Sequence, residues 1–318
     1  MKTKIVHFLK QAQGYLSGEE ISRDLKISRA GIWKYMQELR KEGYDIVAVP
    51  HLGYRLISCP DKLLPSEIQS GLGTKALGRD IRYYDSVAST MDIAFQLGME
   101  GAGEGTVVCA ESQSKGKGRL GRSWASPKGK GIYMSVILRP SLAPTEVAKL
   151  TLLSAVATCE AIQKFCNVET KIKWPNDILV GNKKLAGILT ELSAEMDRVR
   201  FVVIGIGVNI NTPISQLPPN ATSIRNETGR KSSRAGLLQE ILRSLEEWYG
   251  GLSAQGFDPV ITRWKKLSST LGQHVRVADL SGDIEGKAID LDEYGGLIIQ
   301  SNDGLTVKRM TGDVILVE

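Results

Sequence analysis

The stretch Glu111-Ser-Gln-Ser-Lys-Gly-Lys-Gly-Arg-Leu-Gly-Arg-Ser-Trp124 is strongly basic and is punctuated by glycine. Apolar, β-branched segments at 106–110 and 132–138 flank it, and their composition predicts two buried strands. The connection of about 20 residues is too long for a simple hairpin, and loops of this length are usually functional or disordered. Its glycines let backbone N–H groups approach an anion, and its lysine and arginine side chains supply matching charge. The stretch therefore predicts a site for a phosphate-bearing ligand.

The same stretch formally contains G-x-G-x-x-G at Gly116, Gly118 and Gly121, which would also fit a dinucleotide-binding loop. That fingerprint requires a helix to begin at its last glycine. Here Pro127 and Gly129 would interrupt such a helix. The sequence also lacks the G-x-x-x-x-G-K-[ST] pattern of P-loop proteins. If a nucleotide binds, we expect it to bind in another way.

The composition indicates a soluble globular protein of two or three domains. The chain has 318 residues, of which 42% are hydrophobic, with a formal net charge of +6 and a pI near 9.0. This excess of positive charge permits an acidic partner such as nucleic acid or a nucleotide. The four cysteines lack C-x-x-C spacing and the three histidines are scattered, so we expect neither a protein metal site nor a disulfide framework.

Neither a secretory signal nor a membrane span is indicated. The first ten residues contain lysines but no apolar run of signal length. The longest apolar stretches, near 150–162 and 201–210, are shorter than a membrane span and carry polar residues. We therefore expect a cytoplasmic, reduced protein with no membrane partner.

Residues 1–62 are predicted to form a winged helix-turn-helix domain. Ser17 or Gly18 can cap a short helix, and Ser28 can cap a second one that Gly43 ends. The second helix carries an apolar stripe at positions i, i+4 and i+7, namely Ile32, Met36 and Leu39. Two strand-like runs, 44–49 and 53–57, then supply a β wing.

The face of the second helix opposite its apolar stripe predicts DNA contacts. Arg29, Lys34 and Gln37 are residue types that touch phosphates and base edges, and Ser28 stands at the helix start. Residues 1–60 hold ten Lys and Arg against six Asp and Glu. The alternative is a helical protein-docking domain, because such units are also used for protein contacts.

The pattern of secondary-structure signals changes near residue 272. Residues 63–271 alternate helix and strand signals and predict a mixed sheet with packed helices, so the whole is an α+β multidomain protein. Helices are expected at 145–165, 232–252 and 257–271, and a buried strand at 202–210. Residues 272–318 read as short alternating strands with turn signals, which predict a small β-barrel.

Several polar motifs in the central segment have plain structural explanations when each is taken alone. Ser89 and Thr90 can cap a helix, and Lys183 and Lys184 can be solvated charges after a hairpin turn. Glycines in a strand can mark close packing. Their joint presence and order, however, resemble the biotin protein ligase family. The matching motifs are Ser89-Thr90, Gln113, Gly116-Lys-Gly-Arg-Leu-Gly-Arg122 with Trp124, Lys173-Trp-Pro-Asn-Asp177, Lys184-Leu-Ala-Gly187 and Gly205-Ile-Gly-Val-Asn209.

The resemblance covers essentially the full chain and is closest to the bifunctional members, which combine the ligase with a biotin-operon repressor. It implies a catalytic domain at 63–271 with a class II aminoacyl-tRNA-synthetase-like, biotin-ligase-like fold, and an SH3-like β-barrel at 272–318. It also implies activation of biotin by ATP to biotinyl-5′-AMP, then transfer to a lysine of a biotin carboxyl carrier protein. Magnesium would bind mainly through the ATP phosphates.

The resemblance also assigns roles to individual residues. Arg119 and Lys184 would hold the biotin carboxylate and the α-phosphate, and Asp177 would orient or deprotonate the acceptor lysine. The implied biotin-binding residues are Ser89, Thr90, Gln113, Lys117, Gly118, Arg119, Lys184, Gly187, Gly205 and Gly207. The implied ATP or adenylate residues are Arg119, Arg122, Trp124, Asn176, Lys184 and Asn209.

Two positions depart from the family pattern. Lys117 stands where arginine is common, which keeps the charge but loses the planar fork. Met91 stands where asparagine is usual, which removes a side-chain hydrogen bond to the ligand. Because Arg119 and Lys184 remain, activity is expected to persist.

In repressors of the family that the chain resembles, the adenylate-bound form dimerises and binds palindromic operator DNA, so the resemblance implies this regulation here. Three alternatives remain open: a ligase without operator function, a lipoate or octanoate ligase, and a regulator that binds biotin but has lost catalysis. The operator, the regulated genes and the acceptor enzyme do not follow from the sequence.

Overall fold

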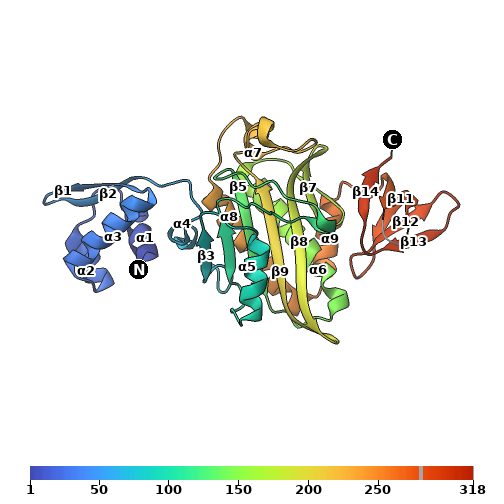
Figure 1. Cartoon of the computed structure of the whole chain (residues 1–318), viewed down its shortest axis with the longest axis horizontal. Helices are drawn as coiled ribbons and strands as arrows, with labels where there is room; N and C mark the ends of the chain where they lie inside the picture. Colours follow the sequence, from blue (N-terminus) through green and yellow to red (C-terminus); the bar gives the residue numbers. More distant parts are fainter. Residues whose placement is uncertain (279–281, 318) are drawn as a thin grey trace. The chain divides into compact units, whose positions relative to one another are not determined.

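The structure is a computed structural model that describes residues 1–278 and 282–317. Its contacts divide the chain into two units, Met1–Gly73 and Thr74–Glu318 (Figure 1). The first unit extends beyond residue 62, and the domain boundaries at 62 and 271 stay predictions. Within the described ranges, no helix is both long and apolar enough to cross a membrane.

The first unit contains the predicted pair of helices. Its elements are α1 (Lys2–Gln11), α2 (Gly18–Leu25), α3 (Arg29–Glu42), β1 (Asp45–Val49), β2 (Gly53–Ser58) and α4 (Pro65–Gln69). Ser17 forms a capping box with Glu20 at the start of α2, and the Ser28 hydroxyl accepts from the Gly31 N–H at the start of α3. Gly43 ends α3 with φ of 108°, a conformation that favours glycine.

The helix pair is held by apolar side chains on one face of each helix. Ile32, Met36 and Leu39 of α3 are fully buried, which confirms the predicted stripe. The strands β1 and β2 form a two-stranded antiparallel sheet after α3. Away from this stripe, Arg29, Trp33 and Lys34 of α3 are exposed.

The second unit is built on a seven-stranded sheet in the order β3-β4-β5-β9-β8-β7-β6. The strands are β3 (Ile81–Tyr84), β4 (Val107–Ala110), β5 (Gly131–Leu138), β6 (Lys171–Lys173), β7 (Asp177–Val180), β8 (Lys183–Glu195) and β9 (Arg198–Asn209). β3 and β4 are parallel and every other neighbouring pair is antiparallel, so the sheet is mixed as predicted. β4 and β5 are fully buried, which confirms the two strands expected on either side of the basic stretch.

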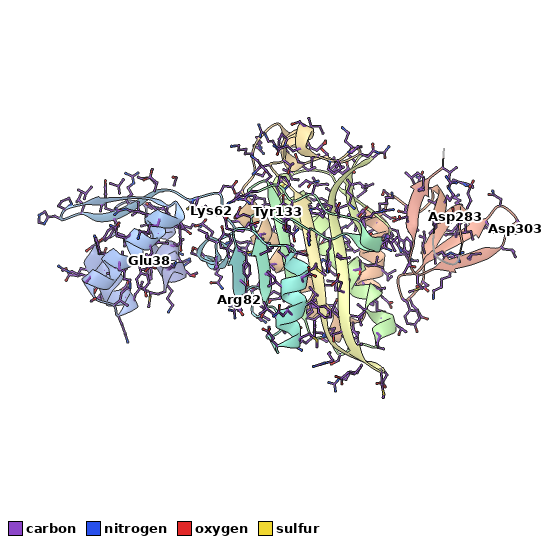
Figure 2. All side chains as sticks on the ribbon, in the orientation of Figure 1. Glu38, Lys62, Arg82, Tyr133, Asp283 and Asp303 are labelled. Atoms are coloured by element: carbon purple, nitrogen blue, oxygen red, sulfur yellow. The ribbon has the colours of Figure 1, made fainter. Side chains whose placement is uncertain are left out.

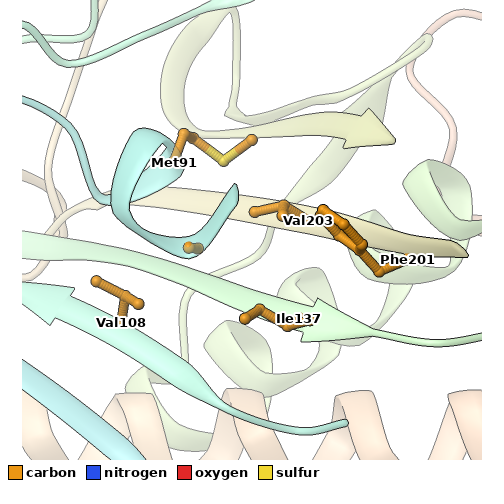
Figure 3. Packing of buried hydrophobic residues seen from close by; sticks show 6 residues of the cluster. Met91, Val108, Ile137, Phe201 and Val203 are labelled. Carbon is orange, nitrogen blue, oxygen red and sulfur yellow. The ribbon is translucent and has the colours of Figure 1, made fainter. Parts of the chain in front are cut away.

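The second unit also contains helices, most of which lie against this sheet (Figure 1). They are α5 (Thr90–Met99), α6 (Ala148–Cys166), α7 (Ile224–Thr228), α8 (Arg234–Gln255) and α9 (Asp258–Leu267). α5 packs on β4, β5 and β9, while α6 packs against α8 and α9. Met91 of α5 inserts among Val108, Ile137, Phe201 and Val203, which form a buried cluster (Figure 3). This packing fixes the N-terminus of α5 against the sheet.

The C-terminal segment forms a five-stranded antiparallel sheet in the order β13-β12-β11-β10-β14. Its strands are β10 (His274–Ala278), β11 (Ile284–Leu291), β12 (Leu297–Ser301), β13 (Thr306–Arg309) and β14 (Asp313–Leu316). Trp174 is almost fully buried and donates through Nε1 to the Gly295 carbonyl at 3.0 Å. One residue of the Lys173–Asp177 motif therefore joins the two sheets.

Candidate active site

A pocket with a volume of about 120 Å³ lies at the N-terminus of α5, and we call it the ligand pocket. The predicted site residues that line it are Thr90, Gln113, Lys117, Gly118, Arg119, Arg122, Trp124, Asn176, Asp177, Lys184, Gly187, Gly205 and Gly207. A more open hollow of about 690 Å³ shares Trp124, Asp177 and Lys184 with it and adds Asn209. Residues from the 111–130 loop, β7, β8 and β9, which are far apart in the sequence, thus meet in one place.

The loop of residues 111–130, which we call the ligand loop, folds back on itself above the pocket. The Gly118 N–H donates to the Arg122 carbonyl at 2.7 Å, and the Trp124 N–H donates to the Gly116 carbonyl at 2.9 Å. A Cβ at Gly116 would lie 2.4 Å from the Trp124 carbonyl oxygen, so only glycine fits there. Residues 116–124 of the loop therefore form a hairpin-like turn.

One end of the pocket is neutral and polar. The Gln113 amide oxygen accepts from the Thr90 N–H at 2.8 Å and from the Thr90 hydroxyl at 3.0 Å. Ser135 donates to the Thr90 hydroxyl at 2.9 Å, and the Gln113 amide donates to Ser126 at 2.9 Å. Such a chain of fixed donors and acceptors suits a neutral, hydrogen-bonding group in a dry pocket.

Ser89, which the resemblance assigns to biotin, does not line the pocket, whereas its neighbour Met91 does. Ser89 is almost fully buried and caps α5, where its hydroxyl accepts from the Met91 N–H at 3.2 Å. Met91 lines the pocket, and a Cβ at Gly205 would lie 2.5 Å from its sulfur. The bulk of methionine is thus accommodated by the absence of a side chain at Gly205.

Trp124 lies across a floor of glycines from β8 and β9. Gly187 and Gly207 are paired across these strands. A Cβ at Gly207 would lie 2.6 Å from the indole ring, and one at Gly187 would lie 3.1 Å from it. The indole Nε1 is buried and has no hydrogen-bond partner among the described residues. Because a buried unpaired donor is costly, this atom is a candidate to bond a ligand.

Two cations from distant segments converge beside the indole. Arg119 donates to the Asn176 side-chain oxygen at 3.0 Å and lies 3.4 Å from the Gly312 carbonyl. Lys184 pairs with Asp177 at 2.7 Å, and its ammonium lies 5.4 Å from the centre of the Trp124 ring. These contacts hold positive charge at the middle of the pocket.

The outer cations of the ligand loop are paired with carboxylates. Lys117 contacts Asp92 and lies 3.8 Å from Glu191. The hydrogen bond to Asp92 raises the pKa of Lys117, against the opposing effect of partial burial, so its charge persists at neutral pH. Arg122 pairs with Asp313 of β14.

The predicted DNA-contacting residues lie on the first unit and not in this pocket. Arg29 pairs with Glu19 at 2.9 Å, with both side chains 74% exposed, and Lys34 is exposed. Ser28 is occupied as the helix cap, and Gln37 is half-buried. Trp33, which we did not single out from the sequence, is 59% exposed beside them.

Sequence reasoning also missed several residues of the ligand pocket. Ser135 does not line the pocket itself but supports it by donating to the Thr90 hydroxyl, and this polar residue inside the apolar run 132–138 was a usable signal. Tyr133 of β5, which Figure 2 labels within the second unit, also belongs to the pocket lining. Asp313 gave no signal, because it reaches the ligand loop only through the folding of the C-terminal sheet.

Comparisons with known proteins agree with this arrangement. Residues 83–209 match the model of the biotin/lipoate A/B protein ligase family, residues 2–55 match an HTH domain, and residues 270–317 match the biotin protein ligase C-terminal domain. The chain is 42% identical over 308 residues to the bifunctional ligase/repressor BirA of Bacillus subtilis (strain 168), across 96% of this chain and 95% of that protein. The chain belongs to the biotin protein ligase family.

Other members of the ligase family extend the likeness. The chain is 32% identical over 270 residues to the biotin–[acetyl-CoA-carboxylase] ligase of Mycobacterium tuberculosis, across 80% of this chain and 97% of that one. The solved biotin protein ligase from Aquifex aeolicus in complex with biotin and ATP superposes with a TM-score of 0.65 at 28% identity. That match covers 75% of this chain and 99% of the Aquifex chain.

Proposed function

We propose that this protein is an ATP-dependent biotin protein ligase. It joins biotin to ATP, giving biotinyl-5′-AMP and pyrophosphate, and then transfers biotin to a lysine of a biotin carboxyl carrier protein. The observation that carries the proposal is the convergence of Arg119 and Lys184 in one pocket, next to the neutral Thr90–Gln113 end and the glycine floor under Trp124.

In the first step, a carboxylate oxygen of biotin attacks the α-phosphorus while the bond to the pyrophosphate leaving group breaks. The two reactants are both anions, so the protein must neutralise and align them, and it needs no nucleophile of its own. Arg119 and Lys184 are proposed for this role. Mg²⁺ would enter with the ATP phosphates, which supply most of its ligands in such sites.

In the second step, the lysine amine of the carrier attacks the acyl carbon, the acyl–phosphate bond breaks and AMP leaves. The amine must be neutral to attack, so a nearby carboxylate assists by accepting its proton. Asp177 lies at the junction of the ligand pocket and the open hollow. We assign it the role of orienting or deprotonating the lysine, with Lys184 turned toward the adenylate phosphate.

The two halves of biotinyl-5′-AMP are assigned to opposite ends of the site. Thr90 and Gln113 would bond the ureido head of biotin, with Ser89 acting through the cap of α5. Lys117 and Gly118 would close over biotin, while Gly187, Gly205 and Gly207 let backbone approach it. Trp124 would stack on adenine, with Arg122 near the phosphates and Asn176 and Asn209 on the nucleotide side.

We also propose that the protein is a biotinyl-5′-AMP-dependent repressor that dimerises on adenylate binding and binds operator DNA. Ser28, Arg29, Lys34 and Gln37 would face the DNA, and β1 and β2 would form the wing of a winged helix-turn-helix. In this proposal the catalytic sheet is of the class II aminoacyl-tRNA-synthetase type and the C-terminal sheet is an SH3-like barrel. Such a protein would act in the cytoplasm.

ATP–pyrophosphate exchange with biotin, lipoate or octanoate as the only added acid tests the enzymatic proposal. Biotin alone should support exchange, because the Thr90–Gln113 end offers paired donors and acceptors that a plain acyl chain cannot use. Exchange with lipoate or octanoate instead would move the protein to that ligase class. Tight biotin binding without exchange would make it a sensor.

A further inference from the structure

A buried ion pair lies behind the ligand pocket, outside the residues assigned above. Glu111 directly follows β4, and Arg234 is the first residue of α8. Arg234 Nη1 and Glu111 Oε2 are 2.8 Å apart, with side-chain exposures of 1% and 4%. By contrast, the Arg263–Glu160 pair between α9 and α6 is 37% and 28% exposed. The Glu111–Arg234 pair is thus shielded from water.

The pair touches both ends of the ligand loop. Glu111 is the first residue of the loop, and Gly131 begins the strand that follows it. Arg234 Nη1 lies 2.8 Å from the Glu111 carboxylate and 3.4 Å from the Gly131 carbonyl oxygen. The Gly129 N–H also donates to the Glu111 carbonyl at 3.0 Å. One guanidinium therefore closes the base of the loop.

The same pair lies next to a residue that lines the pocket. Tyr133 donates from its hydroxyl to the Pro127 carbonyl at 3.0 Å, which ties the C-terminal part of the loop to β5. Burial raises the pKa of Tyr133, and the charges of Arg234 and Glu111 act on its phenol with opposite signs. The charges of the ion pair therefore act on Tyr133, and Tyr133 connects the ligand loop to the wall of the pocket.

Stability alone is a weak reason for such a pair. The desolvation of two charges offsets much of their attraction, and well-packed apolar residues often stabilise a fold equally well. Fixed geometry is what an ion pair adds, because a guanidinium donates in defined directions. We propose that Glu111 and Arg234 are positioning residues, which fix the two ends of the ligand loop so that Gln113 and Arg119 reach biotinyl-5′-AMP. This proposal rests on the proposed ligase function.

The test compares a double variant, Glu111→Gln with Arg234→Met, with a matched control, Glu160→Gln with Arg263→Met. Removing both partners avoids an unpaired buried charge, so the Tm of the double variant should fall by no more than about 4 °C. The dissociation of biotinyl-5′-AMP should accelerate at least about tenfold, because small misplacements of binding groups are costly. The control should dissociate at the wild-type rate. A wild-type rate in the folded double variant would overturn the proposal.

Trypsin cleavage within the ligand loop gives a readout that does not depend on biotin chemistry. The loop carries six cleavage sites for trypsin, which are Lys115, Lys117, Arg119, Arg122, Lys128 and Lys130. In the ligand-free protein, the double variant should be cut there faster than wild type or the control. If wild type fails to exchange with biotin but this difference appears, the proposed function fails while the clamp of the loop base stands.

A conservative variant covers the case in which the double variant does not fold. Arg234→Lys keeps a charge opposite Glu111 but loses the planar guanidinium, whose Nη1 contacts both Glu111 and Gly131 in a fixed direction. It should keep most of the thermal stability. Biotinyl-5′-AMP should dissociate from it faster than from wild type and, where the double variant folds, more slowly than from the double variant. Dissociation and loop cleavage at wild-type rates in Arg234→Lys would show that the pair only supports the fold.

Discussion

The ligand loop and helix α3 are both basic, but they hold their cations in different ways. In the loop, Lys117 contacts Asp92, Arg122 contacts Asp313, and Arg119 donates to Asn176. On α3, Lys34 is exposed, and the Arg29 pair with Glu19 lies in solvent. At the centre of the loop a cation is therefore held within the pocket, whereas the α3 cations and the outer loop cation Arg122, which is 67% exposed, are hydrated.

This difference indicates the kind of anion that each region suits. Cations held in place within a pocket stabilise a compact phosphate, because little reorganisation is needed when the ligand binds. Hydrated cations on an open helix suit a polyanion, where binding is driven by the release of counterions and depends on salt. Variants that affect one region and leave the other intact test this difference.

Loss of a central pocket cation should have the largest effect. Arg119→Ala or Lys184→Ala should weaken the formation or retention of biotinyl-5′-AMP roughly 10- to 100-fold, since a charge-assisted contact in a dry site contributes roughly 1.5 to 3 kcal/mol. Pyrophosphate exchange and adenylate dissociation measure this loss. Lys183→Ala, the exposed neighbour on β8, is the control and should behave as wild type. Wild-type exchange in the Arg119 or Lys184 variant would mean that the site is misplaced.

Loss of the α3 cations should weaken DNA binding and leave ligand binding unchanged. The double variant Arg29→Ala with Lys34→Ala should weaken operator binding about tenfold, and the slope of log K against log salt should become shallower by about 1.8 if each residue meets one phosphate. Fluorescence titration with operator DNA at several salt concentrations measures both values, with Lys4→Ala on α1 as control. Biotin exchange should be unchanged. A matching loss of exchange would contradict the separation of the two regions.

Much of the fold could be predicted because its elements carry local signals. Ser17, Ser28 and Gly43 mark helix ends in the sequence, and the structure has caps and a stop at these residues. The apolar runs on both sides of the ligand loop are strands β4 and β5. The extent of β8 could not be predicted, because much of its 13 residues is half-exposed and lacks a clear pattern.

The pocket lining was less predictable than the fold. The resemblance named residues of the ligand loop, β8 and β9, and the structure brings most of them together. It did not distinguish Ser89, which caps α5, from Thr90, which lines the pocket. Asp313 and Arg234 lie far away in sequence, and their contacts with the loop depend on long-range packing that no local pattern encodes.

Loss of a carboxylate that lies outside both binding regions should lower the stability of the fold and leave ligand and DNA binding unchanged. Glu246 of α8 accepts from the N–H groups of Lys75, Ala76 and Leu77 at 2.6, 2.7 and 2.9 Å. Burial alone would raise the pKa of Glu246, but these three backbone hydrogen bonds outweigh it and the net shift is downward. Glu246→Gln should therefore lower the free energy of unfolding by about 1 to 2 kcal/mol at pH 7.

The downward shift also fixes the pH dependence of this effect. Because the folded pKa lies below the unfolded one, the stabilisation is present above the unfolded pKa of about 4.3 and is lost as pH falls through the folded pKa. Urea unfolding at neutral and acidic pH should show the Glu246→Gln difference shrinking toward low pH. Glu247→Gln, at the exposed neighbour, should show no difference. A loss that is independent of pH would assign the effect to packing.

The smallest expected effect concerns Lys117, the outer loop cation that departs from the family pattern. Lys117 is 39% exposed and meets Asp92 as a point charge, and such exposed pairs contribute only about 0 to 1 kcal/mol. Lys117→Arg restores a planar fork, so biotinyl-5′-AMP should dissociate more slowly by no more than about threefold. The hydrogen bond to Asp92 raises the pKa of Lys117, so the wild-type charge is kept from pH 7 to 9 and the ratio of the two dissociation rates should not change over that range. A tenfold change would mean that the outer cations of the loop are as closely engaged with the ligand as Arg119, and the contrast with α3 would then extend to the whole loop instead of its centre.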